Sequence, residues 1–159
     1  MKKYIISIDA GTTSNRAILF DLKGKPIFSS QKEFTQYFPK SGWVEHNPEE
    51  IWKTTKKVLK DVILKAKKFK GKILTIGITN QRETTVLWDK KTGKTVYRAI
   101  VWQDRRQADY CKKLKNQNKE TLIFNKTGLP IDSYFSGTKI KWILDNVPLA
   151  KKLMNKRQL

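Results

Sequence analysis

The stretch YIISIDAGTTSNRAILFD, residues 4–21, decides the fold of this chain of 159 residues. Two runs of strand-forming residues, Tyr4–Asp9 and Arg16–Asp21, enclose a loop of small polar residues. A third run, Pro26–Lys32, follows after a turn that contains Gly24. Connections this short join antiparallel neighbours, so we predict a three-stranded antiparallel meander at the N-terminus.

The segment after the meander carries the strongest helical signal in the chain. Asn47 can cap a helix, Pro48 fits the first helical position, and Glu50 can close a capping box. Apolar residues then recur at helical spacing as far as Phe69, and Gly71 ends the pattern. We therefore predict one long helix, which a loop containing Pro39, Gly42 and Trp43 joins to the meander.

The remaining elements complete an α/β plan. A buried strand at Ile73–Thr79 should enter the sheet parallel to an earlier strand, because a helical crossover precedes it. The later elements expected are a hairpin of Thr84–Asp89 and Thr95–Arg98, an apolar run Ala99–Gln103, a helix from about Asp104 to Lys115, a run Leu122–Phe124 leading into a turn, a helix around Ile140–Leu144 that Pro148 stops, and a helical pattern in Lys151–Leu159. This order predicts a mixed sheet with helices, similar to the ribonuclease-H-like core of actin-like ATPases.

Composition limits the classes of function. Apolar residues make up 38% of the chain, enough for a real core, and the single Cys excludes an internal disulfide. The apolar stretch after Lys3 is interrupted at Asp9, so it is too short for a signal peptide or a membrane span. We therefore expect a cytoplasmic protein without a membrane span.

The formal net charge of +20 raises the question of a nucleic-acid partner. Most Lys residues fall on expected helix faces and turns rather than in one patch, so we expect no specific nucleic-acid partner. Such a surface should still bind polyanions weakly and in a salt-sensitive way. A basic, non-catalytic module that binds nucleotides or nucleic acid is the alternative of a different class.

The loop between the first two strands has the features of a phosphate site. Gly11 lets backbone amides approach an anion closely, and Asp9 ends a strand where it can hold Mg²⁺. Arg16 supplies positive charge. Hydroxyl donors follow Gly11 at Thr12, Thr13 and Ser14. The same residue types also suit an ordinary hairpin turn, and that alternative stays open.

A second polar cluster follows the apolar run Ile73–Ile78 and extends from Thr79 to Glu83. Ligands of open α/β sheets bind at strand ends of this kind. Arg82 offers a fork of donors and Glu83 offers acceptors, which together suit a small neutral molecule rich in hydroxyls. The alternative is an exposed Arg–Glu pair on a tight turn, which would contribute little to stability.

These segments, in this order, resemble the FGGY family of carbohydrate kinases and, within it, the glycerol kinases. The resemblance rests on Asp9–Arg16, Gly42–His46 with Pro48, Glu50–Trp52, Gly77–Thr85, Ala99–Gln103, Thr127–Leu129, and Ile131-Asp132 with Tyr134–Lys139. It therefore covers nearly the whole chain. The segments around Arg82-Glu83 and Tyr134–Lys139 are specific to the glycerol branch.

The resemblance implies a phosphotransferase of glycerol catabolism, which phosphorylates glycerol to sn-glycerol 3-phosphate with ATP and Mg²⁺. By motif match, Asp9 would bind Mg²⁺, and the phosphates of ATP or ADP would be bound by Thr12, Thr13, Ser14 and Arg16. Glycerol hydroxyls would bind Arg82, Glu83 and Tyr134, and Trp102 would lie against the carbon face of glycerol. Another polyol or a sugar as the substrate is the alternative within the family.

The resemblance also implies that the chain is part of a longer, homo-oligomeric protein. Family members are about three times as long and contain two related domains. We therefore expect residues 1–159 to form an incomplete N-terminal kinase domain, without the second domain. The family's catalytic Asp lies in a Gly-Asp-Gln segment, and neither Asp104 nor Asp132 matches it. The chain departs from the family at Ala10 and Asn15, where Gln and Ser are usual, and we expect it to be inactive alone.

Overall fold

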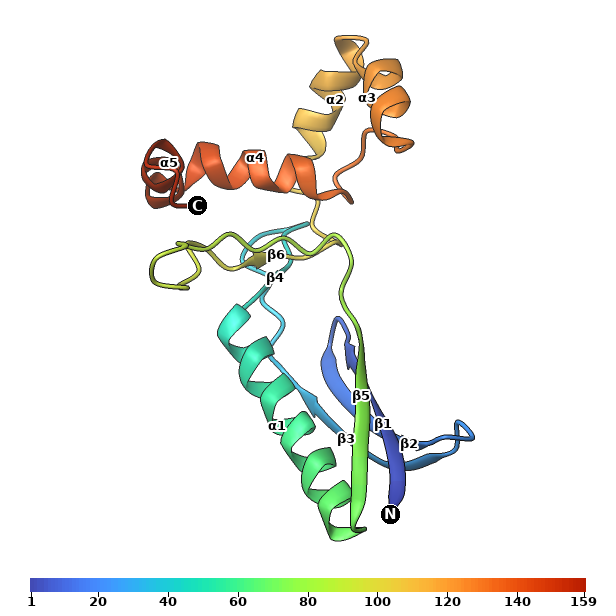
Figure 1. Ribbon diagram of the computed structural model, residues 1–159. Helices are drawn as coiled ribbons and strands as arrows, with labels where there is room; N and C mark the ends of the chain where they lie inside the picture. The colour runs from blue at the N-terminus through green and yellow to red at the C-terminus, as the bar shows by residue number, and fades with distance from the viewer. The chain divides into compact units, whose positions relative to one another are not determined.

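The computed structural model describes residues 1–159, which form two compact units (Figure 1). The first unit consists of Met1–Gln36 and Glu49–Gln81. The second unit consists of Tyr37–Pro48 and Arg82–Leu159. None of the helices has the length and hydropathy that crossing a lipid bilayer requires.

The first unit contains a four-stranded mixed sheet with the strand order β3-β2-β1-β5. The strands β1 (Lys2–Ala10), β2 (Ser14–Asp21) and β3 (Pro26–Glu33) are antiparallel neighbours. After helix α1 (Pro48–Lys68), β5 (Gly71–Thr79) returns parallel to β1. The predicted meander, long helix and parallel strand are confirmed.

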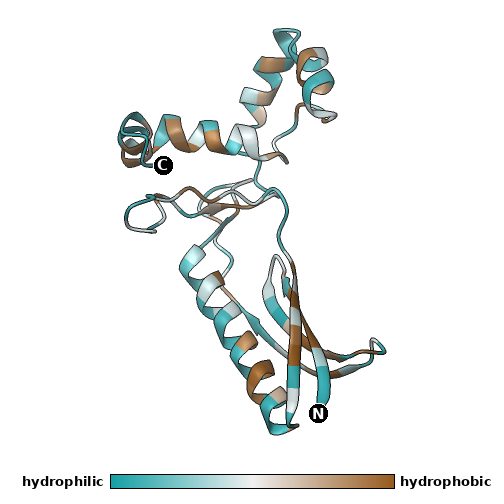
Figure 2. Cartoon of the chain, viewed as in Figure 1, coloured by the Kyte–Doolittle hydropathy of each residue, from teal (hydrophilic) through white to brown (hydrophobic).

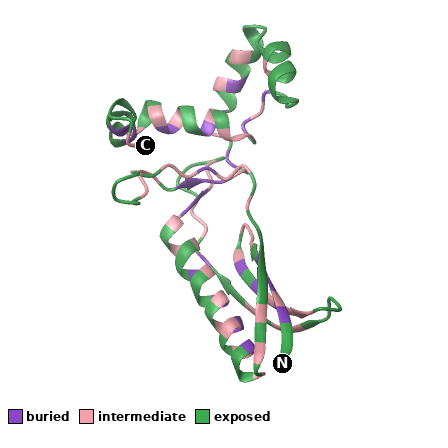
Figure 3. Cartoon of the chain, viewed as in Figure 1, coloured by how far each residue is buried: buried purple, intermediate pink, exposed green.

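Helix α1 packs on the sheet through alternate residues of the strands and one stripe of the helix. The buried side chains of this core are Tyr4, Ile6 and Ile8 of β1, Ala17 and Leu19 of β2, and Val58, Val62 and Ala66 of α1. Their spacing of two along strands and four along the helix is the periodicity that places side chains on one face. Figure 3 shows these buried positions as bands on α1, β1 and β2. The core of this unit therefore lies between α1 and the sheet.

The start of β5 needs a glycine. A Cβ built on Gly71 would lie 2.1 Å from a ring carbon of Tyr4, and no real Cβ contact is that short. The register pairs Lys2 of β1 with Gly71, and the Tyr4 ring lies over that position. Gly71 thus does more than end the helical pattern, because its missing side chain makes room for the aromatic edge of the core.

The expected burial of β5 is wrong. The strand lies at the edge of the sheet, and Ile76 and Ile78 are 41% and 72% exposed. The register places these two residues beside Ile6 and Ile8 of β1, which are buried. An edge strand has a neighbour on one side only, so its apolar side chains remain uncovered at that side. Figure 2 shows the hydrophobic bands along β5.

The second unit contains a small two-stranded antiparallel sheet of β4 (Glu45–His46) and β6 (Ala99–Ile100). The strand β4 falls in a segment that was expected to be a loop. The predicted hairpin is present only as isolated bridges, in which Trp88 pairs with Thr95 and Thr85 pairs with Ile100. Only the first of these bridges joins the two predicted strands, because Ile100 lies in β6. The hairpin therefore closes at its turn without forming regular strands on both sides.

Four helices complete the second unit: α2 (Ala108–Asn116), α3 (Glu120–Thr127), α4 (Ser136–Asn146) and α5 (Pro148–Asn155). Helix α2 begins at Ala108 rather than near Asp104, because Asp104 is used in a buried ion pair described below. The run Leu122–Phe124 lies in helix α3, and the expected turn follows it at Gly128, which caps the helix with a φ of 70°. Pro148 stops α4 and also begins α5.

Candidate functional site

The loop between β1 and β2 is a tight turn closed by its own backbone. The Gly11 N–H donates to the carbonyl oxygen of Ser14 at 3.0 Å. A Cβ on Gly11 would lie 3.0 Å from that same oxygen, so the close turn favours glycine. The strand register places Asp9 opposite Arg16 at the base of the loop. The turn thus presents Thr12 and Thr13 between an exposed carboxylate and an exposed guanidinium.

A glutamine on β3 orders the polar side chains of this loop. The Gln31 amide nitrogen donates to the Ser14 hydroxyl oxygen at 2.9 Å, and its amide oxygen accepts from Nε of Arg16 at 3.0 Å. Gln36 donates to the carbonyl oxygen of Thr12 at 3.1 Å. Sequence reasoning missed both glutamines, because only the pairing of β2 with β3 brings Gln31 next to Arg16.

Asn15 anchors the loop to helix α1. Its side chain is buried, and its amide nitrogen donates to the Ile51 carbonyl oxygen at 2.9 Å and to the Thr54 hydroxyl at 2.6 Å. The Thr54 hydroxyl in turn donates to the carbonyl oxygen of Glu50 at 2.8 Å. The departure at Asn15 from the usual Ser therefore places a structural anchor inside the unit, while Ser14 and Arg16 remain at its surface.

Glu83 occupies the most unusual backbone position of the second polar cluster. Its φ is 65°, in the left-handed region that residues other than glycine rarely adopt. Its Oε2 accepts hydrogen bonds from the backbone N–H and the hydroxyl of Ser136, at 2.8 and 2.6 Å. Ser136 is the first residue of α4, so the carboxylate lies at the positive end of that helix. Glu83 is thus held by α4 and not by its exposed neighbour Arg82.

Aromatic side chains from two other segments accompany Glu83. The rings of Trp102 and Tyr134 meet edge to face, with their centroids 5.8 Å apart. Tyr134 also packs edge to face against Phe135 at 5.1 Å. The backbone N–H of Trp102 donates to the Thr84 hydroxyl at 3.3 Å, which links the segment of Trp102 to the residue that follows Glu83. Three of the predicted ligand residues, Glu83, Trp102 and Tyr134, are therefore connected through short contacts within one unit.

A cavity of about 650 Å³ borders Glu83 on the side of helices α2, α3 and α4. Its lining combines apolar side chains with polar ones, which include Glu83, Asp132 and Ser136. Trp102 and Tyr134 are not among the lining residues. The aromatic pair therefore does not line this cavity, which Glu83 borders.

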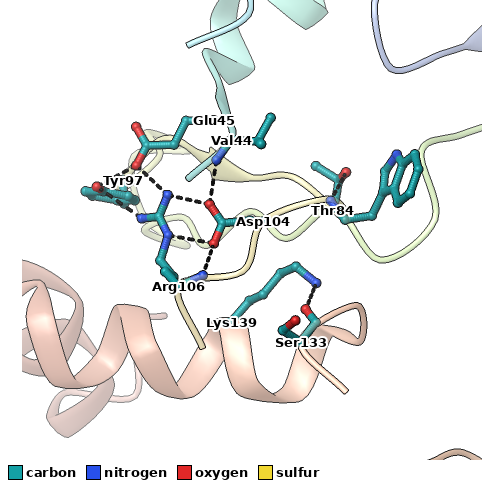
Figure 4. Close-up of polar contacts among 9 residues, drawn as sticks. Val44, Glu45, Thr84, Tyr97, Asp104, Arg106, Ser133 and Lys139 are labelled. Atoms are coloured by element: carbon teal, nitrogen blue, oxygen red, sulfur yellow. Dashed lines mark hydrogen bonds and ion pairs between the residues drawn. The ribbon is translucent and has the colours of Figure 1, made fainter. Parts of the chain in front are cut away.

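A buried guanidinium supports the segment that carries Trp102 (Figure 4). The Arg106 side chain is fully buried. It donates to both carboxylate oxygens of Asp104, at 2.9 and 2.8 Å, and to Oε1 of Glu45 at 2.8 Å. Tyr97 donates its hydroxyl to the same Glu45 oxygen at 2.8 Å, and Asp104 also accepts from the Val44 N–H at 2.7 Å. The network ties β4 to the chain segment directly after β6.

Aromatic rings enclose the Arg106 guanidinium as well. Its central carbon lies 3.8 Å from the ring centre of Trp43 and 4.6 Å from that of Trp142. Burial opposes the charge of Arg106, but the hydrogen bonds to Asp104 and Glu45 outweigh it and raise the pKa of the guanidinium above its ordinary value. Burial and Glu45 likewise raise the pKa of Tyr97. The only indication of this buried network in the sequence was that Asp104 and Arg106 follow an apolar run.

No group of three or more His, Cys, Asp or Glu side chains in the chain could hold a metal ion. Asp9, at the base of the phosphate loop, belongs to no such group. A single carboxylate is consistent with Mg²⁺, which is usually bound by one or two carboxylates together with water and substrate phosphates.

Comparison with known proteins shows which family has this architecture. The model of the FGGY family of carbohydrate kinases, N-terminal domain, matches residues 4–158. The chain is 59% identical over 152 residues to the glycerol kinase of Alkaliphilus metalliredigens and 57% identical over 159 residues to that of Alkaliphilus oremlandii. These matches cover 96% and 100% of this chain. The chain spans only 30% and 32% of the length of those relatives.

Solved structures agree with the sequence matches. The crystal structure of Plasmodium falciparum glycerol kinase with ADP matches with a TM-score of 0.91 at 34% identity, over 99% of this chain and 31% of that one. The gluconate kinase of Lactobacillus acidophilus matches with a TM-score of 0.86 at 25% identity, over 96% of this chain and 30% of that one. These matches confirm the predicted mixed α/β fold of the actin-like type.

Proposed function

Because the chain belongs to the FGGY family of carbohydrate kinases, we propose that it supplies the first phosphate loop and the glycerol-binding residues of a glycerol kinase. The reaction would transfer the terminal phosphoryl group of ATP to glycerol and yield sn-glycerol 3-phosphate. The proposal rests on two neighbouring observations: Ser136 donates a hydrogen bond to the Glu83 carboxylate, and the rings of Trp102 and Tyr134 are in contact. The 59% identity to a glycerol kinase supports this substrate over a sugar.

The proposed glycerol site uses complementary donors and acceptors. Ser136 takes both of its hydrogen bonds to Oε2 of Glu83, so Oε1 can accept from a hydroxyl of glycerol. The exposed guanidinium of Arg82 and the hydroxyl of Tyr134 would bind further hydroxyls. The Trp102 ring would lie against the carbon atoms. A site that reads hydroxyl groups discriminates strongly against analogues that lack one, because its buried polar groups are then left unpaired.

The proposed nucleotide site is the loop between β1 and β2. The hydroxyls of Thr12, Thr13 and Ser14 and the guanidinium of Arg16 would bind the phosphates of ATP. Asp9 would bind Mg²⁺, either directly or through water. The tight turn at Gly11 supports this role, since it exposes small polar groups at a strand end. Mg²⁺ would neutralise charge on the phosphates, and phosphoryl transfer depends mainly on such positioning and charge stabilisation.

We propose that the catalytic base is a residue outside residues 1–159. Residues 1–159 would form part of the N-terminal domain of a cytoplasmic, homo-oligomeric kinase, consistent with the 30% of the relative's length that they span. Neither Asp104 nor Asp132 is free to serve as the base. Asp104 is fully buried against Arg106, and Asp132 accepts from Arg105 and from the Tyr134 N–H. The chain alone should therefore bind ligands without turning over.

Calorimetric titration of the purified chain with glycerol tests the site. The wild type should bind glycerol, whereas Glu83→Ala should abolish measurable binding. Glu120→Ala is the matched control, because Glu120 is an exposed carboxylate in the same unit. Equal affinity of wild type and Glu83→Ala would contradict the assignment. A panel of polyols and sugars on the same calorimeter separates glycerol from the other substrates of the family.

Two further assays address the base and the alternative function. Incubation of the chain with ATP, Mg²⁺ and glycerol should give no glycerol phosphate, and robust turnover would refute a base outside the chain. DNA binding should disappear as salt is raised to physiological strength, because the lysines are spread over the surface. Binding that persists above that strength would favour a nucleic-acid module instead.

A further inference from the structure

Lys139 is a fully buried residue, and its side chain is one of the largest in the protein that are shielded from solvent. It lies in the first turn of α4, and its ammonium group reaches back to the segment that precedes the helix (Figure 4). Nζ donates to the carbonyl oxygen of Ser133 at 2.8 Å, to that of Phe135 at 3.3 Å, and to that of Tyr134. The three donors of one ammonium group thus meet three successive backbone carbonyls.

Burial of a lysine in this way is unfavourable for the free energy of folding. Lys side chains are almost never fully buried unless they are paired, and desolvation of the charge is unfavourable. Lys139 forms no salt bridge, and burial lowers its pKa to about 8 despite the favourable fields of Glu83, Asp104 and Asp132. The carbonyl contacts are therefore the direct partners that hold the charge in place. An apolar side chain of similar length would fill the same space without that cost.

The carbonyls that Lys139 binds belong to the segment that builds the proposed glycerol site. Phe135 precedes the helix with an extended backbone, φ −80° and ψ 153°. Tyr134 and Phe135 form the aromatic contacts on one side of the segment, and Ser136 holds Glu83 directly after it. The orientation of three successive peptide groups therefore controls both the Tyr134 ring and the donors to Glu83.

We infer that Lys139 is a positioning residue: its buried ammonium group fixes the backbone of Ser133–Phe135 and so sets Tyr134 and Glu83 for glycerol. The inference rests on the proposed function, since it assigns Lys139 to the same site. Lys139 does not touch glycerol itself, because its three donors are used by the carbonyls. Its effect on binding is transmitted through the backbone.

The test compares the complete 159-residue chain with Lys139→Met and with a control on the same helix, Lys141→Met. Lys141 is exposed and paired with Asp145, so its replacement should leave the site unchanged. Three quantities are measured: the near-ultraviolet circular dichroism of the aromatic residues, the dissociation constant for glycerol, and the melting temperature. Lys139→Met should change the aromatic spectrum and weaken glycerol binding about tenfold or more, as expected when contact groups are misplaced.

A chemical rescue separates the role of the ammonium group from general stability. Lys139→Cys in a Cys111→Ala background, alkylated in urea with 2-bromoethylamine and refolded, restores an ammonium group at the same reach. The Cys111→Ala protein taken through the same treatment is its control. Restoration of the aromatic spectrum and of glycerol affinity supports the inference. A loss of both without any rescue, in a protein that refolds, would overturn it, because an ammonium group restored at the same reach should bind the three carbonyls again.

The outcomes keep this inference distinct from the proposed function. If the wild-type chain binds no glycerol, the proposed site fails. The aromatic spectra then decide on Lys139 without any ligand, and an unchanged spectrum in Lys139→Met overturns the positioning role. Should Lys139→Met not fold, Lys139→Gln gives the same comparison, because its amide retains a donor without charge. An unchanged spectrum and affinity in that variant would equally refute the inference.

Discussion

Ser136 donates both its hydroxyl and its backbone N–H to the same carboxylate oxygen of Glu83, at 2.6 and 2.8 Å. Two donors on one oxygen fix the plane of the carboxylate while the other oxygen stays available. Glu83 has a φ of 65°, so its backbone carries strain that the surrounding contacts must maintain. Strained backbone of this kind is concentrated at functional sites, and here it falls on the residue with the strongest claim to bind glycerol.

Removal of the Ser136 hydroxyl should therefore weaken glycerol binding. Ser136→Ala keeps the backbone donor and loses the bond of 2.6 Å to Glu83. A hydrogen bond to a charged group contributes about 1.5 to 3 kcal/mol, so we expect the glycerol dissociation constant to rise by about one to two orders of magnitude. Calorimetry on the purified chain measures it. Ser41→Ala, at an exposed position in the same unit, serves as the control and should bind as wild type does.

The two neighbouring arginines should differ sharply in their effect on stability. Arg106→Met leaves the buried carboxylates of Asp104 and Glu45 unpaired and should lower the free energy of unfolding by about 3 to 5 kcal/mol. Arg105→Met removes only an exposed pair with Asp132 and should cost about 0 to 1 kcal/mol. Urea unfolding followed by tryptophan fluorescence measures both. Similar losses for the two variants would show that burial of the network does not matter.

The first unit offers a matched pair of glycines in one strand. Gly71→Ala places a Cβ 2.1 Å from the Tyr4 ring, which must move, and overpacking of a core costs about 1 to 3 kcal/mol. Gly77→Ala meets no atom within 4 Å and should be neutral or slightly stabilising. The midpoint of urea unfolding distinguishes them. Equal midpoints would mean that the contact between Tyr4 and Gly71 is not formed in solution.

Lys139 should give the stability of the protein a distinct pH dependence. Burial lowers its pKa from 10.5 to about 8 in the folded state. Between these two values the unfolded chain binds more protons than the folded chain, so this group makes the protein more stable as pH rises from about 8 to 10.5. The gain is at most about 3 kcal/mol. The groups that act on it are Glu83, Asp104, Asp132 and Cys111.

The difference in unfolding free energy between wild type and Lys139→Met, measured from pH 7 to 10.5, isolates this effect. The other lysines deprotonate in both proteins and cancel. The difference should shift in favour of the wild type as pH rises. A difference that stays flat across this range would show that Lys139 is not desolvated in the folded protein.

Local signals were sufficient for the first unit. The meander, helix α1 and the parallel strand β5 followed from short connections, a capping pattern and one hydrophobic period. The burial of β5 could not be predicted in the same way. A continuous apolar run has the same appearance in a central strand and in an edge strand, because the sequence does not state how many neighbours a strand has.

The candidate site was predictable in its residues more than in its architecture. Glu83, Trp102 and Tyr134 were selected by motif, and the structure connects them through Ser136 and Thr84. Their roles in glycerol binding remain predictions, as do those of Asp9, Thr12, Thr13, Ser14, Arg16 and Arg82 in binding ligands. The sequence did not reveal the residues that support the site, because a charged side chain such as that of Arg106 is expected at the surface. Only the fold reveals that its partners Glu45 and Asp104 surround it.

The open side of β5 has a practical meaning for work at the bench. The backbone N–H and C=O groups on its outer edge pair with no further strand, and Leu74, Ile76 and Ile78 add exposed apolar side chains beside them. Exposed edge strands of this kind tend to pair with edge strands of other molecules. Concentrated samples of this protein should therefore aggregate through pairing of β5 between molecules. The substitution Ile78→Lys would place a charge on this edge and should reduce aggregation during purification and storage.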